Sequence, residues 1–301
     1  MKLRHDIEND LEHTIPPLGG PDSRWLFRAM TERSLAWIEP GPGRCVVDLA
    51  SGMGQDTLAL AVRAVPEPGR GQGKGNSAGA ARPSLVIGVE PSNRMIRFGQ
   101  LLQRQGPSGT GEPAVAGAPV MASASSARAA AVRFVRGLGE EIPLRSSSVD
   151  ALLCKGALDH FMDPVLTVGE IGRVLKPGGR AVIALANYGS LSCRLGRRLD
   201  RGRGRTAGAA PPYYEPPPDH LTCFTYGSIV ALAAAPLRVR RVEGVSLLWG
   251  FPPWGRLLNR LPGPLQSGLL WLAHAVARRR PAWADVVLLV AEKADLPRAA
   301  S

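Results

Sequence analysis

The sequence predicts an α/β fold in which helices cover both faces of a mostly parallel β-sheet. Two observations predict it. Short apolar segments alternate with segments of helical periodicity, which is typical of parallel strands joined by helices. The first apolar segment, residues 46–49, runs into a glycine-rich turn and then into a helical pattern that begins near Thr57. Ligands of such folds bind at the carboxyl edge of the sheet. The turn after residue 49 therefore marks the expected active site.

The glycine-rich turn narrows the choice of ligand. Residues 46–54 read Val-Val-Asp-Leu-Ala-Ser-Gly-Met-Gly, and glycines let a ligand approach the backbone because they carry no Cβ. A dinucleotide fingerprint would need a third glycine, and Thr57 holds that position. A phosphate-binding loop would need Ser or Thr after Gly73-Lys74, and Gly75 stands there. On this segment alone, an ordinary glycine-rich turn remains the alternative.

The same segment resembles the first motif of the class I S-adenosylmethionine-dependent methyltransferases, which reads apolar-apolar-Asp-x-Gly-x-Gly-x-Gly. The chain departs from it at Ala50, where alanine permits close approach if its φ is negative. Residues 85–90 predict a second buried strand that ends at Glu90, and the resemblance implies that this carboxylate binds the cofactor ribose. Glu90 lies 36 residues after Gly54, against roughly 20 in dinucleotide folds. A Gly- and Pro-rich insertion within residues 66–84 accounts for the excess.

Later segments resemble the family in the same order. Residues 132–136 alternate like a third strand. Residues 137–144 resemble the family segment Gly-Asp-Ala-Glu-x-Leu-Pro-Phe. Leu138 stands where the family has the Asp that contacts the adenine amino group, and its side chain cannot accept a hydrogen bond. The adenine contact must then come from the backbone, from Glu140 or from water.

Residues 148–154 match the fourth strand, and residues 170–180 match the family's Glu-x-x-Arg-Val-Leu-Lys-Pro-Gly-Gly turn into strand five, residues 181–186. The resemblance covers residues 44–186. It implies a Rossmann-like sheet of seven strands with the last strand antiparallel, S-adenosylmethionine as cofactor, and a single methyltransferase domain over residues 1–301. The implied cofactor-binding residues are Asp48, Ala50, Ser51, Gly52, Gly54, Glu90, Pro91, Leu138, Gly139 and Lys155.

The region after the fourth strand holds the first candidates for the acceptor side. Methyl transfer from a sulfonium is an in-line displacement, and holding the nucleophile in line can contribute about 7–11 kcal/mol. A general base is needed only for a poorly acidic hydroxyl. His160 is the first candidate for catalysis or substrate orientation, followed by His220 and Tyr214, with structural roles as the alternatives. Residues 155–158 lack the Asn/Asp-Pro-Pro-Tyr motif of nucleic-acid amide methyltransferases, which disfavours DNA adenine as acceptor.

The remaining segments complete the expected organisation. Residues 22–39 predict an amphipathic helix that either caps the cofactor pocket or packs at the sheet edge. Residues 66–84 and 105–130 lack hydrophobic periodicity and predict disordered surface insertions. Residues 187–280 predict an elaboration on the substrate side, including a helix whose N-cap is Thr225.

The end of the chain predicts two more strands with two helices between them. Residues 238–248 predict strand six, and residues 284–292 predict the last strand, antiparallel beside it in this family. The helical region 249–280 carries an apolar stripe that ends in three arginines. Core packing, a substrate cap, or an interfacial helix for a lipid-linked substrate are the alternatives for this stripe.

Charge and cysteine content bound the partners. The net charge is +12, with arginines clustered at residues 194–205 and 278–280. Three interpretations of these arginine clusters stay open: solvated faces, contact with an anionic membrane surface, and contact with a phosphorylated carrier. Nucleic acid is disfavoured because residues 194–205 offer no aromatic stacking platform. The four cysteines show no metal-site or disulfide spacing, so no metal is expected, and Cys45 and Cys154 are expected to act as small hydrophobic residues.

The sequence thus predicts methyl transfer from S-adenosylmethionine to a small-molecule, glycan or lipid-linked acceptor. An RNA or protein methyltransferase is one alternative. A non-catalytic relic of the fold is another, motivated by Ala50 and Leu138. The first twenty residues carry four acidic residues and no continuous apolar run, which argues against a signal peptide. The apolar stretches are shorter than the about 20 residues of a membrane span, so a cytoplasmic protein, with peripheral membrane contact as an option, is the expectation.

Overall fold

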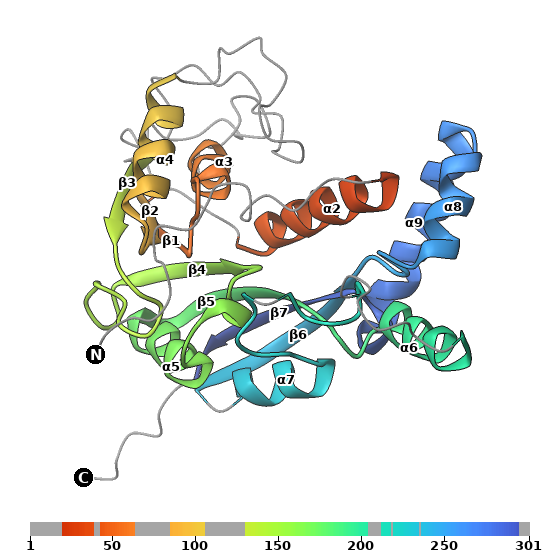
Figure 1. Cartoon of the computed structure of the whole chain (residues 1–301). Coiled ribbons are helices and arrows are strands. Elements are labelled where there is room, and N and C mark those ends of the chain that lie inside the picture. Colours follow the sequence, from red (N-terminus) through yellow and green to blue (C-terminus); the bar gives the residue numbers. More distant parts are fainter. Residues whose placement is uncertain are drawn as a thin grey trace, which may run out of the picture.

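The computed structural model describes residues 20–38, 43–63, 85–105, 130–203, 212–217, 219–234 and 236–294. Within these residues, seven strands form one sheet in the order β3-β2-β1-β4-β5-β7-β6 (Figure 1). The strands are β1 Cys45–Leu49, β2 Leu85–Glu90, β3 Ala131–Arg136, β4 Val149–Lys155, β5 Leu175–Ala186, β6 Leu237–Val245 and β7 Val286–Lys293. The pairs among β1–β5 are parallel, and β7 runs antiparallel between β5 and β6. The predicted α/β fold, with its antiparallel last strand, is confirmed.

Helices cover both faces of this sheet (Figure 1). The described helices are α2 Pro21–Ile38, α3 Gln55–Arg63, α4 Asn93–Gln105, α5 Pro164–Val174, α6 Leu191–Arg203, α7 Tyr226–Ala234, α8 Pro252–Arg260 and α9 Gly263–Arg279, with short 3₁₀ helices η3 Leu158–His160 and η4 Pro281–Trp283. Helices α2, α3 and α4 lie on one face, and α5 and α7 lie on the other. Across the described segments, no helix is both long enough and apolar enough to cross a bilayer.

The core follows the alternation of the strands. Successive residues of a strand point to opposite faces. Val47 and Leu152 accordingly pack with the α5 and α7 side chains, whereas Val46 and Leu153 pack with those of α2 and α3. All four side chains are buried. Burial on both faces explains why the strands read as nearly continuous apolar runs in the sequence.

Two helix caps are present, and the one at Thr225 was predicted. Ser92 Oγ accepts a hydrogen bond from Met95 N at 3.2 Å, directly before α4. At the start of α7, Ser228 N donates to Thr225 Oγ1 at 3.5 Å, and Thr225 N donates to Ser228 Oγ at 2.8 Å. This reciprocal arrangement is a capping box.

Strand five begins earlier than expected. It starts at Leu175, directly after α5, instead of at Ala181. The pairing with β4 jumps from Val149–Leu175 to Ala151–Arg180, so the Lys-Pro-Gly-Gly segment bulges out of the ladder. Gly178 permits the bulge because its φ of +70° is a left-handed conformation that glycine adopts without a Cβ penalty.

Strand six ends earlier than expected, at Val245 instead of residue 248. Ser246 and Leu248 both have positive φ, at +61° and +66°, and such residues do not continue a strand.

Helix α2 packs on the sheet face and reaches the carboxyl edge. Leu26, Met30 and Leu35 are buried against the sheet. Arg33 of α2 also pairs with the buried Glu243 of β6 at 2.8 Å. The helix thus lies over the face of the sheet, and its contact with the carboxyl edge is described below. The insertions expected at 66–84 and 105–130 lie outside the described residues, apart from their end residues Gln105 and Ala130.

Candidate functional site

The turn after β1 runs through three left-handed residues. Ala50, Gly52 and Gly54 have φ values of +57°, +51° and +79°. The condition set for Ala50, a negative φ, is therefore not met. An L-residue in this conformation costs about 1–2 kcal/mol because its Cβ crowds the following carbonyl oxygen. The position has the backbone of the family's glycine but the side chain of an alanine.

Gly54 also makes room for a side chain of the sheet. A Cβ at Gly54, Gly88 or Gly99 would lie 2.7–2.8 Å from the ring of Phe134 on β3. Three glycines from the turn, β2 and α4 therefore enclose one phenyl ring. This packing gives Gly54 a structural reason to be glycine, and its role toward a cofactor stays a prediction.

The buried side chain of Asp48 links the end of β1 to the start of α3. Its side chain is buried, and Thr57 Oγ1 donates to its Oδ2 at 2.6 Å. Burial raises the pKa of Asp48 to about 7, helped by the charge of Asp56. Thr57 stands where a dinucleotide fingerprint would have its third glycine. Its hydroxyl is thus the partner that fixes Asp48, the acidic residue of the motif.

Glu90 connects the turn to the helix after β2. Its carboxylate accepts from Gly52 N at 2.9 Å and from Ser92 N at 3.1 Å. The side chain is buried at the carboxyl end of β2. The next residue, Pro91, offers its carbonyl oxygen to Arg136 Nε at 3.0 Å. A carboxylate held rigidly at this strand end suits the paired hydroxyls of a ribose.

Ser51 turns away from this edge. Its N–H donates to Val89 O at 3.1 Å. Its Oγ lies 2.9 Å from where a Cβ of Gly88 would stand, and it has no hydrogen-bond partner among the described residues. A contact of Ser51 with the cofactor stays a prediction.

Lys155 crosses the edge at the end of β4. Its Nζ lies 2.5 Å from Asp56 Oδ2 at the start of α3 and donates to Thr31 Oγ1 of α2 at 2.7 Å. The following Gly156 has a φ of +62°, and a Cβ there would meet no atom within 4 Å. Lys155 thus ties α2 across the carboxyl edge beside an open backbone position. This is where a capping role for α2 would act.

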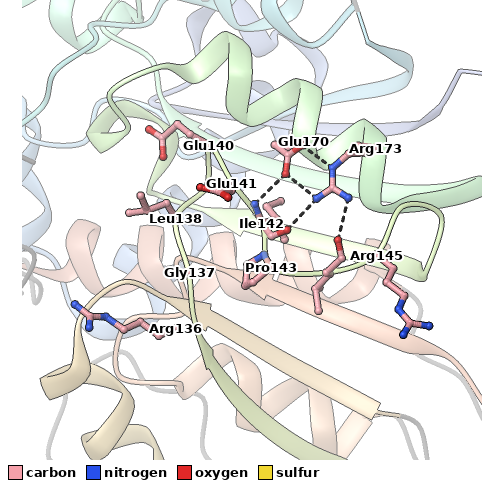
Figure 2. Close-up of a pocket in the computed structure, with 11 residues that line it drawn as sticks. Arg136, Gly137, Leu138, Glu140, Glu141, Ile142, Pro143, Arg145, Glu170 and Arg173 are labelled. Atoms are coloured by element: carbon pink, nitrogen blue, oxygen red, sulfur yellow. Dashed lines mark hydrogen bonds and ion pairs between the residues drawn. The ribbon is translucent and has the colours of Figure 1, made fainter. Parts of the chain in front are cut away.

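The loop after β3 is held by the Glu-x-x-Arg pair of α5 (Figure 2). Arg173 pairs with Glu170 at 2.6 Å and donates to the carbonyls of Ile142 and Leu144. Glu170 in turn accepts from Ile142 N at 2.9 Å. The motif that carried much of the family resemblance therefore fixes this loop, in agreement with its expected structural role.

The same loop carries the predicted adenine side. Leu138 bridges to Glu141, and a Cβ on Gly139 would lie 3.0 Å from the Phe161 ring. Glu140 accepts from Met162 N at 2.8 Å, so its carboxylate faces the segment before α5. The source of the adenine contact, backbone, Glu140 or water, stays a prediction. A hollow of about 700 Å³ runs along the loop, and Leu138 is the one predicted cofactor residue among its lining residues.

A cluster of polar side chains lies beyond β4. We call it the Asp159 cluster; its members are Asp159, His160, Tyr188, Asp219 and His220. His220 Nδ1 lies 3.0 Å from Asp159 Oδ2 and 3.0 Å from the Tyr188 hydroxyl. The two histidine rings meet edge to face with centroids 4.5 Å apart. Burial lowers the pKa of His220, and burial with the Asp159 charge raises the pKa of Tyr188. The structure thus brings the two candidates His160 and His220 together.

Backbone contacts hold this cluster in place. Leu221 N and Thr222 N donate to the carbonyl of Asp159 at 2.8 and 3.1 Å. Tyr214, the third candidate, lies elsewhere: its hydroxyl donates to Asp200, and the Arg197 guanidinium lies over its ring. Tyr188 takes the place expected of Tyr214. A signal existed, because Asp159 and Tyr188 each follow the carboxyl end of a predicted strand.

Comparison with known proteins identifies the family. A family model described as a methyltransferase domain matches residues 67–183. An uncharacterized methyltransferase of Mycobacterium ulcerans is 30% identical over 254 residues, covering 76% of this chain and 86% of that protein. The chain belongs to the class I S-adenosylmethionine-dependent methyltransferases.

Further relatives match this methyltransferase over shorter spans. An uncharacterized methyltransferase of Mycobacterium bovis is 39% identical over 149 residues, 49% of this chain and 42% of the relative. A demethylmenaquinone methyltransferase of Corynebacterium kroppenstedtii is 29% identical over 174 residues, 58% of this chain and 53% of the relative. The chain thus spans about half the length of these two curated relatives.

A solved structure supports the fold. The complex between the Haloferax volcanii Trm112 methyltransferase activator and a putative methyltransferase matches with a TM-score of 0.51 and 16% identity, over 91% of this chain and 92% of that chain. At this identity the likeness concerns the fold alone.

Proposed function

We propose that this methyltransferase transfers a methyl group from S-adenosylmethionine to a small, lipid-linked acceptor. The observation that carries the cofactor half is Glu90. Its buried carboxylate stands at the end of β2, and the N–H groups of Gly52 and Ser92 fix it. The acceptor half rests on the Asp159 cluster and on exposed apolar side chains of α8, α9 and η4.

The residues of the carboxyl edge fit the cofactor. Glu90 would hold the ribose hydroxyls, and the turn of residues 50–54 would lie under the nucleoside. Lys155 lies at the same edge, where it pairs with Asp56, and its positive charge would also attract the carboxylate of the cofactor. The Ala50 methyl narrows the turn by one carbon, and the family's glycine backbone is kept.

When bound, the cofactor would supply an activated methyl group on a positively charged sulfur, with the neutral thioether as leaving group. The protein has to hold the acceptor nucleophile in line with that methyl group, and alignment contributes about 7–11 kcal/mol. His160 and His220 would orient the acceptor, because His160 follows β4 at the carboxyl edge and the His220 ring packs against it. His160 is partly exposed, so an acceptor reaches this side from solvent.

The C-terminal helices favour an acceptor at a membrane surface. Large apolar side chains of α8, α9 and η4 are exposed, with Trp271 at 64% and Leu265 at 61%. Residues 244–284 contain five arginines and no acidic residue. Exposed tryptophan and leucine beside arginines is the composition of an interfacial helix on anionic lipid. The corynebacterial relative is named for demethylmenaquinone, which supports a small-molecule acceptor.

Calorimetric titration with S-adenosylmethionine tests the cofactor half. Glu90→Ala removes the acceptor of two backbone hydrogen bonds and the proposed ribose contact, and we expect a loss of affinity of roughly 100-fold. Gly52→Val fills the turn at a φ of +51° and should abolish binding. Glu292→Ala is the matched control, because Glu292 lies on β7 and pairs with Arg240. Wild-type affinity in Glu90→Ala would contradict the placement, and no binding by the wild type would favour the relic.

Vesicle co-sedimentation tests the membrane half. We expect binding to vesicles containing phosphatidylglycerol, weaker binding to phosphatidylcholine alone, and a clear loss in Trp271→Ala. Leu101→Ala is the control, because Leu101 is also exposed, at 53%, but lies on α4. Equal binding by both variants would remove the lipid argument. A steep salt dependence of RNA filter binding would instead favour the RNA alternative.

A further inference from the structure

Three residues with metal-binding side chains converge beyond β4. Asp159 and His160 belong to η3, and His220 comes from the segment before α7. One ligand atom from each residue lies within 4.8 Å of the others. Two imidazoles and one carboxylate form a common ligand set for divalent transition metals. The cysteine spacing gave no hint of this site, because no cysteine takes part.

The carboxylate of Asp159 carries an unsatisfied oxygen. Oδ2 is engaged by His220 Nδ1 at 3.0 Å. Oδ1 is fully buried and has no hydrogen-bond partner among the described residues. Its neighbour is His160 Nε2 at 4.0 Å. Asp159 as a whole is only 3% exposed. Leaving a buried charged oxygen unpaired costs about 1–3 kcal/mol or more, so such an atom indicates a missing partner.

The surroundings hold the histidines as metal sites usually do. His160 Nδ1 lies 3.2 Å from the carbonyl oxygen of Asp219. A donation from Nδ1 to this carbonyl leaves Nε2 as the free lone pair, directed toward Asp159 Oδ1. A ligating histidine almost always gives its other ring N–H to a carbonyl or carboxylate in this way. At His220, the Tyr188 hydroxyl lies 3.0 Å from Nδ1, the same nitrogen that faces Asp159 Oδ2, and helps to fix the ring beside that carboxylate.

We propose that Asp159, His160 and His220 bind one divalent first-row transition metal ion. The ion would satisfy Asp159 Oδ1 and draw His160 Nε2 in from its present 4.0 Å. Metal–ligand bonds of about 2.0–2.2 Å bring two tetrahedral ligand atoms closer together than 4.0 Å, and the His160 side chain is 38% exposed. Magnesium fits poorly, because it prefers oxygen ligands to imidazole.

Three protein ligands leave coordination positions open on the exposed side of His160. Those positions face the region that the proposed function gives to the acceptor, so an acceptor oxygen can take one of them. The metal site itself does not depend on methyl transfer. It can be present in a protein that binds no cofactor.

Metal binding is measured directly on the full chain after removal of any affinity tag. Cobalt(II) is titrated and followed by its visible absorption, and zinc is titrated by calorimetry, both without S-adenosylmethionine. We expect one ion per chain. We expect at least a tenfold weaker affinity in His160→Ala, His220→Ala and Asp159→Asn. His274→Ala is the matched control, because His274 is a half-buried histidine on α9, away from the cluster.

The outcomes separate this inference from the proposed function. Stoichiometric binding that His160→Ala weakens and His274→Ala does not, with millimolar magnesium unable to compete, supports the site. His160 carries the test if the other two variants fail to fold, since its side chain is partly exposed. No binding by the wild type, or equal binding by His160→Ala, overturns it. Loss of cofactor binding with metal binding intact affects the proposed function alone.

Discussion

Asp48 and Asp159 are both buried carboxylates near the carboxyl edge of one sheet, yet their surroundings differ. Cys154 of β4 lies near both: burial raises the pKa of its thiol, and the two negative charges add to that. The Asp48 carboxylate accepts a hydrogen bond from Thr57, nine residues along the chain. Asp159 has one oxygen against His220 and one without a partner among the described residues. The Asp48 carboxylate therefore stabilises the turn after β1, whereas Asp159 leaves one oxygen for the metal ion that we propose.

The largest expected effect is a separation of two binding activities. Asp48→Ala releases Thr57 and loosens the turn under the proposed nucleoside, so S-adenosylmethionine binding should fall below detection while cobalt binding persists. Asp159→Asn should do the reverse. Calorimetry with the cofactor and absorption with cobalt(II) give both numbers on each variant.

The comparison fails if the two variants lose the same activity. Loss of both activities in both variants would mean that the two carboxylates form one site. Circular dichroism and the unfolding midpoint of each variant establish that it folds.

The second effect is the pH dependence of stability at Asp48. Burial raises its pKa to about 7, above its value in the unfolded chain. The folded state therefore binds the proton more tightly, and this contribution is complete below about pH 4 and is lost as the pH rises toward 7. Each pKa unit corresponds to about 1.4 kcal/mol, so the free energy of unfolding should fall by a few kcal/mol in total over this pH range.

Urea unfolding at several pH values between 4.5 and 7.5 measures this slope, and Asp48→Asn should remove it. Asp150→Asn is the opposing control. Burial alone would raise the pKa of Asp150, but hydrogen bonds from Lys176 and Cys45 N hold it below its usual value. Its contribution is therefore complete above about pH 4 and is lost only at lower pH, so Asp150→Asn should keep the wild-type slope between pH 4.5 and 7.5. A wild-type slope that survives in Asp48→Asn would show that another group carries it.

The third effect compares the partners of the two carboxylate sites. Thr57→Val leaves Asp48 Oδ2 without its hydroxyl donor and should lower the free energy of unfolding by about 1–3 kcal/mol. Tyr188→Phe removes the hydroxyl that lies against His220 Nδ1, and His220 still contacts Asp159. The free energy of unfolding should fall by about 0.5–1.5 kcal/mol. Urea unfolding at pH 8 with a chelator present gives both values. A larger loss in Tyr188→Phe would reverse the comparison.

These partners also show where sequence reasoning reached its limit. The strands, the cap at Thr225 and the Glu-x-x-Arg turn were predicted because periodicity, capping and turn chemistry are local. The contact of Thr57 with Asp48 was not predicted, because no local pattern indicates that the Thr57 hydroxyl reaches that carboxylate. The contact between Asp159 and His220 depends on how the chain returns over the sheet edge, and neither residue alone predicts it.

The positive φ of Ala50 was also not predicted from the sequence. A substitution at this position has the smallest expected effect on stability. The φ of +57° favours glycine, so Ala50→Gly relieves about 1–2 kcal/mol of strain. The glycine also gives the unfolded chain more freedom, which offsets about 0.5–1 kcal/mol. A net gain of about 0.5–1 kcal/mol in urea unfolding is expected, with no loss of cofactor affinity.

Ala59→Gly is the matched control for this change, because Ala59 is a buried residue inside α3. There the same substitution lowers stability by about 1 kcal/mol or more. The two alanines lie nine residues apart around the Asp48–Thr57 contact. Opposite signs at the two positions would show that backbone conformation decides the outcome, and equal losses would mean that Ala50 is not strained in solution.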